Sequence, residues 1–276
     1  MINVLQIPRL TALLSKCWRD AESDLQAEIN QYAPSASEEL ITQNFHKELS
    51  RTLSAASANR SIELAFLNDL DRSGWRQKVK FDSRRIARGL IAEVTLHKPE
   101  TEKLSGGDLG LVVVRPQLQL AQRAINISDM GQGLLVQAKL KGPQRWGTFT
   151  RNQERILPKR MNYLALLLYQ YADPERRRLN SFVWQLADGM SFEDLKACLK
   201  RDHFPYSLDS SRVIAGLTSG RIGTAERQLI DTLISPDQNR ALIIRIHWSD
   251  GEPPSSALRV HSAYETSETV KSVISR

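Results

Sequence analysis

Two short stretches of the chain decide its fold, SGGDLGLVVVRP (105–116) and GLLVQAKLKG (133–142). The first places Asp108 after a pair of glycines, which allow a tight turn, and before an apolar run rich in β-branched residues, which is typical of a strand. The second is a strand-like run that carries Gln137 and Lys139 two residues apart. Because side chains alternate along a strand, these two polar groups share one face. Both stretches therefore predict strands of a core sheet that also carry polar groups.

These polar groups have two interpretations. Asp108 is of a type common in turns, and Gln137 and Lys139 could lie on a solvated strand face. If the two strands are neighbours, a carboxylate, an amide and an ammonium group instead converge at one edge of the sheet. Carboxylate, amide and carbonyl oxygens suit Mg²⁺, and a bound metal lowers the pKa of water while a nearby lysine offsets charge. The second interpretation predicts a site for phosphodiester hydrolysis.

The order GGDLGLVVV and then LLVQAKL resembles the PD-(D/E)xK nuclease superfamily, and within it the Mrr-like restriction endonucleases in which Q-x-K replaces E-x-K. The resemblance implies a restriction-endonuclease-like α/β sandwich with a central mixed sheet flanked by helices. It also implies that Asp108 and Gln137 bind a metal together with the carbonyl of Ala138, and that Lys139 is the catalytic lysine. Mg²⁺ is the implied cofactor, and Mn²⁺ is expected to substitute for it.

The family also has a metal-binding glutamate on a helix before these strands. Glu38 and Glu39 are the candidates, in the predicted helix PSASEELITQNFHKELSRTL (34–53). Glu38 shares a helix face with Phe45 and is therefore expected to point toward the sheet. It also fits an S-x-x-E capping box with Ser35, in which case it would only cap its helix.

The rest of the chain alternates helical and strand patterns. Helices are predicted at 3–32, 34–53, 57–72, 151–172, 191–201 and 223–235, and strands at 89–97, 108–116, 133–140, 180–189 and 240–248. The segment between the second and third strands is predicted as a hairpin or a short helix. Pro158 must kink the helix over 151–172 or mark its true start. The order predicts an α/β fold with a mixed sheet, divided into a helical extension (1–34), a nuclease domain (35–248) and a flexible tail (249–276).

A basic stretch follows the proposed lysine strand. Positive side chains there could neutralise phosphates and an aromatic ring could stack on bases, so the predicted nucleic-acid contacts are Lys141, Arg145, Trp146, Arg151 and Arg155. A solvated helix face with core aromatics is the alternative. Residues 72–88 form a second basic segment. Gln153 follows where related nucleases place residues that support the site.

Composition narrows the class of protein. The net charge of +7 and pI near 9.5 favour polyanionic partners. The longest apolar run, Tyr163 to Tyr169, is far shorter than the roughly 20 residues of a membrane span, so we expect no membrane partner and a cytoplasmic location. Cys17 and Cys198 lack metal-ligand spacing, the five histidines form no metal motif, and no phosphate-binding loop occurs in the sequence.

Together these features predict a Mg²⁺-dependent DNA endonuclease, which the resemblance places in bacterial defence against foreign DNA. Two alternatives stay open: a nuclease-fold subunit of a multiprotein system that only holds nucleic acid, and a nuclease that acts on RNA. A partner protein or a homodimer is expected to help choose the target. Gln137 itself fits either the Mrr-like variant or a site without activity, because an amide binds a metal more weakly than a carboxylate.

Overall fold

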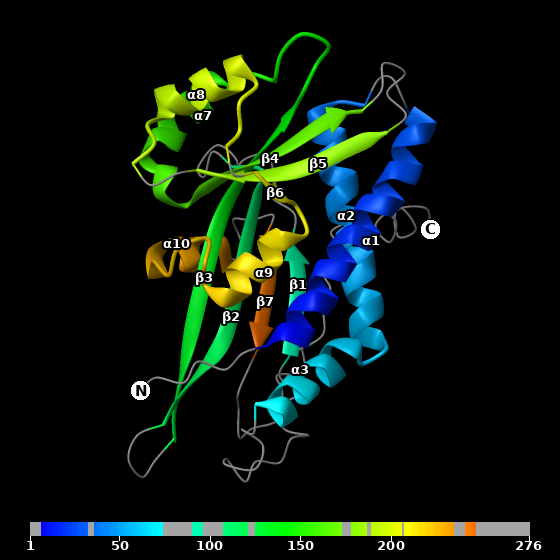
Figure 1. The fold of residues 1–276 in the computed structure, drawn as a ribbon, viewed down its shortest axis with the longest axis vertical. Helices are drawn as coiled ribbons and strands as arrows, with labels where there is room; N and C mark the ends of the chain where they lie inside the picture. Colours follow the sequence, from blue (N-terminus) through cyan, green and yellow to red (C-terminus); the bar gives the residue numbers. More distant parts are fainter. Residues whose placement is uncertain are drawn as a thin grey trace, which may run out of the picture.

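The computed structural model describes residues 7–32, 36–73, 90–95, 107–120, 125–172, 178–186, 189–205, 207–234 and 241–246. Within them lies a seven-stranded mixed sheet with the order β1-β7-β2-β3-β4-β5-β6 (Figure 1). The strands are β1 (Leu90–Thr95), β2 (Leu109–Leu120), β3 (Ile125–Leu140), β4 (Leu164–Tyr171), β5 (Leu179–Gln185), β6 (Leu208–Asp209) and β7 (Ala241–Ile246). The helices are α1 (Pro8–Tyr32), α2 (Glu38–Ala58), α3 (Ser61–Arg72), α7 (Arg151–Ile156), α8 (Phe192–Arg201), α9 (Arg212–Ser219) and α10 (Arg227–Ile234). None of these helices is both long and apolar enough to cross a bilayer.

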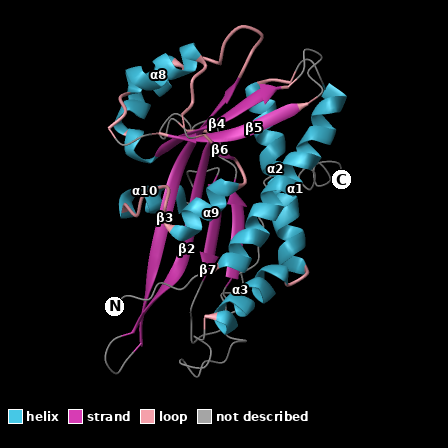
Figure 2. Cartoon of the chain, viewed as in Figure 1, coloured by secondary structure: helices cyan, strands magenta, loops and turns pink. Residues whose placement is uncertain are grey.

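Helices cover both faces of the sheet (Figure 2). One face packs against α1, α2, α3 and α9, and the other against α7, α8 and α10, which gives two separate clusters of buried side chains. Strand β3 contributes to both clusters because its side chains alternate: Val136 and Ala138 belong to the first and Leu135 to the second. The predicted α/β class with a mixed sheet is confirmed.

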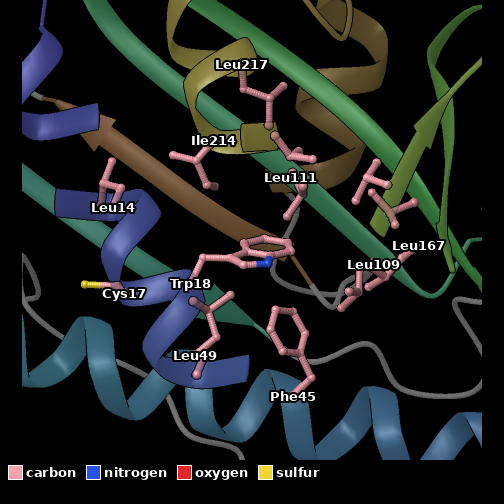
Figure 3. Close-up of a cluster of buried hydrophobic side chains, with 14 of the residues drawn as sticks. Leu14, Cys17, Trp18, Phe45, Leu49, Leu109, Leu111, Leu167, Ile214 and Leu217 are labelled. Carbon is pink, nitrogen blue, oxygen red and sulfur yellow. The ribbon is translucent and has the colours of Figure 1, made fainter. Parts of the chain in front are cut away.

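Helix α1 is part of this core. Figure 3 shows Trp18 of α1 beside Phe45 of α2 and close to Leu109 of β2. The ring centroids of Trp18 and Phe45 are 4.8 Å apart. The helix predicted as part of an N-terminal extension (1–34) therefore packs in the same core as the strands. The tail predicted at 249–276 lies outside the described residues.

Strands β2 and β3 form one long antiparallel hairpin, so the hairpin interpretation of the segment between them is confirmed. Its register runs from Leu109↔Val136 to Leu120↔Ile125. Strand β3 then pairs with β4 in parallel, which requires a crossover connection. Helix α7 and two short 3-10 turns (Leu157–Lys159 and Met161–Tyr163) form that crossover.

The helix predicted over 151–172 is wrong. Helix α7 ends at Ile156, and the apolar run that follows the 3-10 turns is β4. The first six residues of β4 are buried, because the strand lies between β3 and β5 with both faces of the sheet covered. A strand that is buried on both faces has no alternation, so periodicity could not separate it from a helix. Helix α9 and the two-residue strand β6 were not predicted.

Asp69 of α3 holds the first turn of α1. Its side chain is only 1% exposed. Its carboxylate accepts hydrogen bonds from the backbone N–H groups of Arg9 and Leu10, at 3.0 and 2.9 Å. These N–H groups belong to the first helical turn, which has no acceptor within its own helix. The contact therefore caps α1 and fixes it against α3.

Replacing Asp69 with alanine is expected to lower the free energy of unfolding by about 2 kcal/mol, because two N–H groups lose their buried acceptor. Urea denaturation measures this loss. The control is Asp231→Ala, which removes the same charge from an exposed ion pair with Arg227 and should change stability by less than about 0.5 kcal/mol. Equal losses in the two variants would contradict the capping role.

Candidate functional site

Strand β3 extends beyond the start of β2. The hairpin register begins at Leu109↔Val136, and the N–H of Asp108 donates to the carbonyl of Val136 at 2.9 Å. Beyond this point, in the described chain, β3 has a strand partner on the β4 side alone. The backbone N–H groups of Ala138 and Leu140 on the other edge therefore need other acceptors.

Two carboxylates take the place of the missing strand. The N–H of Ala138 donates to Oδ2 of Asp108 at 2.7 Å, and the N–H of Leu140 donates to Oε2 of Glu38 at 2.8 Å. Asp108 comes from the turn into β2, and Glu38 from the first turn of α2. Two elements distant in sequence thus bring acidic groups to one end of β3.

Glu38 contacts β3, and a different residue caps its helix. The N–H of Leu40 donates to Oγ of Ser37 at 3.2 Å, so Ser37 caps α2. Ser35, the capping residue that the sequence suggested, lies outside the described residues. Glu39 is exposed and accepts a hydrogen bond from Gln43. Of the two candidate glutamates, Glu38 is therefore the one at the site.

Lys139 completes an ion pair with Glu38. Its Nζ lies 3.2 Å from Oε1 of Glu38 and 5.1 Å from the ring centroid of Phe149. Lys139 is only 2% exposed, so its charge is held inside the protein next to this carboxylate. A buried ammonium needs such a partner, because burial without one is strongly unfavourable.

Gln137 is fully buried and its amide is hydrogen-bonded on both sides. Its Nε2 donates to Oδ2 of Asp108 and, at 3.2 Å, to the carbonyl of Ala138. Its Oε1 accepts from Nε2 of Gln153 at 3.2 Å. Gln153 lies on α7 and is 4% exposed. Its support of Gln137 agrees with the position that the sequence indicated.

The structure brings all the predicted metal and catalytic residues to one end of β3. Asp108, Glu38 and the Ala138 carbonyl offer oxygen atoms, which are the ligands that Mg²⁺ prefers. Gln137 is the exception, because the group it turns toward Asp108 is its amide nitrogen. No set of three Asp, Glu, His or Cys side chains gathers into a metal centre anywhere in the described part of the chain.

The predicted nucleic-acid contacts divide into two groups. Arg145, Arg151 and Arg155 are exposed. Lys141 instead forms an ion pair with Asp202. Trp146 is only 4% exposed and packs edge-on against the core, so its ring is not available to stack on bases. The alternative interpretation, a core aromatic, holds at this position.

The partner of both Lys141 and Trp146 is Asp202, at the end of α8, which the sequence did not single out. Its carboxylate accepts hydrogen bonds from Nζ of Lys141 and, at 2.7 Å, from Nε1 of Trp146. Lys141 first and Trp146 as well hold the pKa of Asp202 below its usual value, and together they outweigh the opposing effect of burial. This interaction ties the loop after β3 to α8.

A cleft of about 660 Å³ opens beside Glu38. Leu140 and the loop 142–148 form its other walls. Gly147 lies close to the site, and a Cβ at this position would lie 3.0 Å from Oε2 of Glu38, so a larger residue would displace that carboxylate. Glu38 is therefore accessible from this cleft, while Gln137 and Lys139 are buried. The basic segment at 72–88 lies outside the described residues, apart from its first two residues.

The chain matches no family model, and a search of the curated proteins found no match.

The ion pair predicts an asymmetry in stability. Glu38→Ala leaves the Lys139 charge buried without a partner and should lower the free energy of unfolding by about 2 kcal/mol, less than a fully buried pair loses because Glu38 is partly exposed. Lys139→Met keeps the volume, removes the charge and should cost less. In the double variant, the methionine should recover part of the loss seen with Glu38→Ala. Urea denaturation of the four proteins gives the coupling, and additive losses would contradict a stabilising pair.

Proposed function

We propose that the chain is a metal-dependent endonuclease with a restriction-endonuclease-like fold, which hydrolyses phosphodiester bonds in DNA. The observation that carries this proposal is the convergence of two carboxylates, a carbonyl and a buried lysine at the open end of β3. The order along the chain, with α2 carrying Glu38, then β2 preceded by Asp108, then β3 carrying Gln137 and Lys139, also supports the resemblance to the PD-(D/E)xK nucleases. The proposed setting is bacterial defence in the cytoplasm, with a partner protein or a second copy contributing to target choice.

Each residue has a role in this proposal. Asp108 and the Ala138 carbonyl would hold Mg²⁺ or Mn²⁺, and Glu38 would hold water or a second position around it. Such a metal, when bound, polarises the phosphate and lowers the pKa of a bound water. Lys139 offsets the negative charge that develops in the transition state, and its burial strengthens this effect because nearby water screens it less.

The exposed arginines suit a polyanionic substrate. Arg145 lines the cleft beside Glu38, and Arg151 and Arg155 follow on α7. Guanidinium groups bind phosphate in a bidentate manner and carry no sequence preference there. These contacts would position the backbone of the substrate strand next to the carboxylates.

A second candidate function has one specific observation in its favour. The Gln137 amide donates to Asp108, so the site is satisfied without a cation. A nuclease-fold subunit that only holds nucleic acid would need no more than this. Binding to the arginines without cleavage is what this candidate predicts.

Plasmid cleavage with Mg²⁺ or Mn²⁺ tests the proposal. Asp108→Ala and Lys139→Ala should each reduce nicking at least about a hundredfold, because each removes a charge placed at the reacting phosphate. Asp231→Ala on α10 is the control and should cleave like the wild type. Nicking that survives both site substitutions would exclude this site, and DNA binding by a wild type that never cleaves would favour the second candidate. Matched RNA substrates distinguish RNA from DNA as the target.

The arginines predict a change in the salt dependence of binding. The slope of log K against log salt concentration is negative. Replacing Arg145, Arg151 and Arg155 with alanine should reduce its magnitude by roughly 0.9 for each phosphate that is no longer neutralised. Fluorescence anisotropy with a labelled duplex measures this slope.

The matched control replaces three other exposed arginines, Arg212, Arg221 and Arg227, and so removes the same charge from the segment that contains α9 and α10. Equal changes in slope for the two triple variants would show that net charge, and not this surface, determines binding.

A further inference from the structure

Hydrogen bonds in series fix the orientation of the Gln137 amide. The backbone N–H of Thr150 donates to Oε1 of Gln153 at 3.0 Å, and Nε2 of Gln153 donates to Oε1 of Gln137 at 3.2 Å. A backbone N–H can only donate, so the oxygen of Gln153 must face Thr150. Gln153 then has only its nitrogen to offer to Gln137. This leaves the Gln137 nitrogen as the group that faces Asp108.

The Gln137 nitrogen lies between two oxygen atoms that a metal would use. It donates to Oδ2 of Asp108 and to the carbonyl of Ala138. A bound cation would interact with the same two oxygen atoms. The one oxygen that Gln137 could give to a metal points toward Gln153 instead. Both glutamines are buried, so water does not readily replace these bonds.

We propose that Gln153 is a positioning residue that lowers the affinity of the site for divalent cations by holding the Gln137 amide in this orientation. The inference rests on the proposed metal site. Cation binding through Asp108, the Ala138 carbonyl and Gln137 requires the Gln137 amide to reverse. After that reversal, two N–H₂ groups face each other inside the protein, and the buried bond between the glutamines is lost. A loss of this kind reduces affinity roughly tenfold to a hundredfold.

The reversal cannot be relieved by turning Gln153 as well. Its nitrogen would then face the N–H of Thr150, and that N–H would lose its acceptor. Only the other bond of the capping box, from the backbone N–H of Gln153 to Oγ of Thr150, would remain. The capping box at the start of α7 therefore sets the amide orientation at the site. The hydrogen bond at the N-terminus of α7 therefore affects the affinity of the proposed site for a cation.

Gln153→Glu tests the inference directly. A carboxylate only accepts, so it can keep the Thr150 bond while accepting from Nε2 of Gln137, which turns the Gln137 oxygen toward Asp108. We expect the affinity for Mn²⁺ to rise at least about tenfold, measured on the full chain by isothermal titration calorimetry and by the electron paramagnetic resonance signal of free Mn²⁺. Gln153→Met removes the hydrogen bond that holds the Gln137 amide and adds no charge, so it should also raise the affinity for Mn²⁺.

The charge control is Gln144→Glu, which adds the same negative charge on the exposed wall of the cleft and should change the affinity less than Gln153→Glu. Asp108→Ala should remove the binding. One outcome overturns the role of Gln153 and leaves the proposed metal site standing. In it, Asp108→Ala abolishes Mn²⁺ binding, Gln153→Glu binds Mn²⁺ like Gln144→Glu, and Gln153→Met binds it like the wild type. If Asp108→Ala binds Mn²⁺ like the wild type, the proposed site itself is overturned.

Discussion

The N–H groups of Ala138 and Leu140 impose the constraint on which the rest of the site depends. A buried N–H without an acceptor costs about as much as a broken hydrogen bond, so β3 can extend past β2 only if other acceptors replace that strand. Asp108 and Glu38 supply them from positions 30 and 102 residues away in the chain. The docking of α2 and the turn into β2 are therefore coupled to the site, and its carboxylates are positioned by the folding of the backbone itself.

Stability alone does not explain the lysine in this strand. A buried ion pair such as Lys139 with Glu38 is weak evidence for stability, because well-packed apolar residues of similar volume often do as well or better. The neighbouring strand β4 is apolar at the same level of the sheet, where Lys139 pairs with Leu168. A charge that is kept in such surroundings fits a functional role better than a structural one, and this argument does not depend on the resemblance to nucleases.

The residues that meet at the end of β3 could be predicted from the sequence, and the contacts of Lys141 and Trp146 with Asp202 could not. Alternation placed Gln137 and Lys139 on one face, and the helical period placed Glu38 toward the sheet. The strand β4 was missed because burial on both faces removes any period from its sequence. Trp146 packs in the core against Phe204 and donates to Asp202, which lies 56 residues away, so no local pattern could reveal its burial. The mixed α/β class followed from the order of elements, since that order limits the possible layers.

In the proposed metal site, the residue at position 137 affects both the stability of the metal-free fold and the affinity for a cation. A glutamate there would place a third carboxylate beside Asp108 and Glu38, with Lys139 as the one positive group among these four, so the site would be repulsive until a cation arrived. A glutamine removes that repulsion and adds a donor to Asp108, which stabilises the folded chain in the absence of a metal. In the proposed metal site, the same donor would compete with a cation for Oδ2 of Asp108. The affinity of such a site is therefore determined by hydrogen bonds behind Gln137 as much as by the ligands themselves, because the amide orientation decides whether position 137 presents a nitrogen or an oxygen.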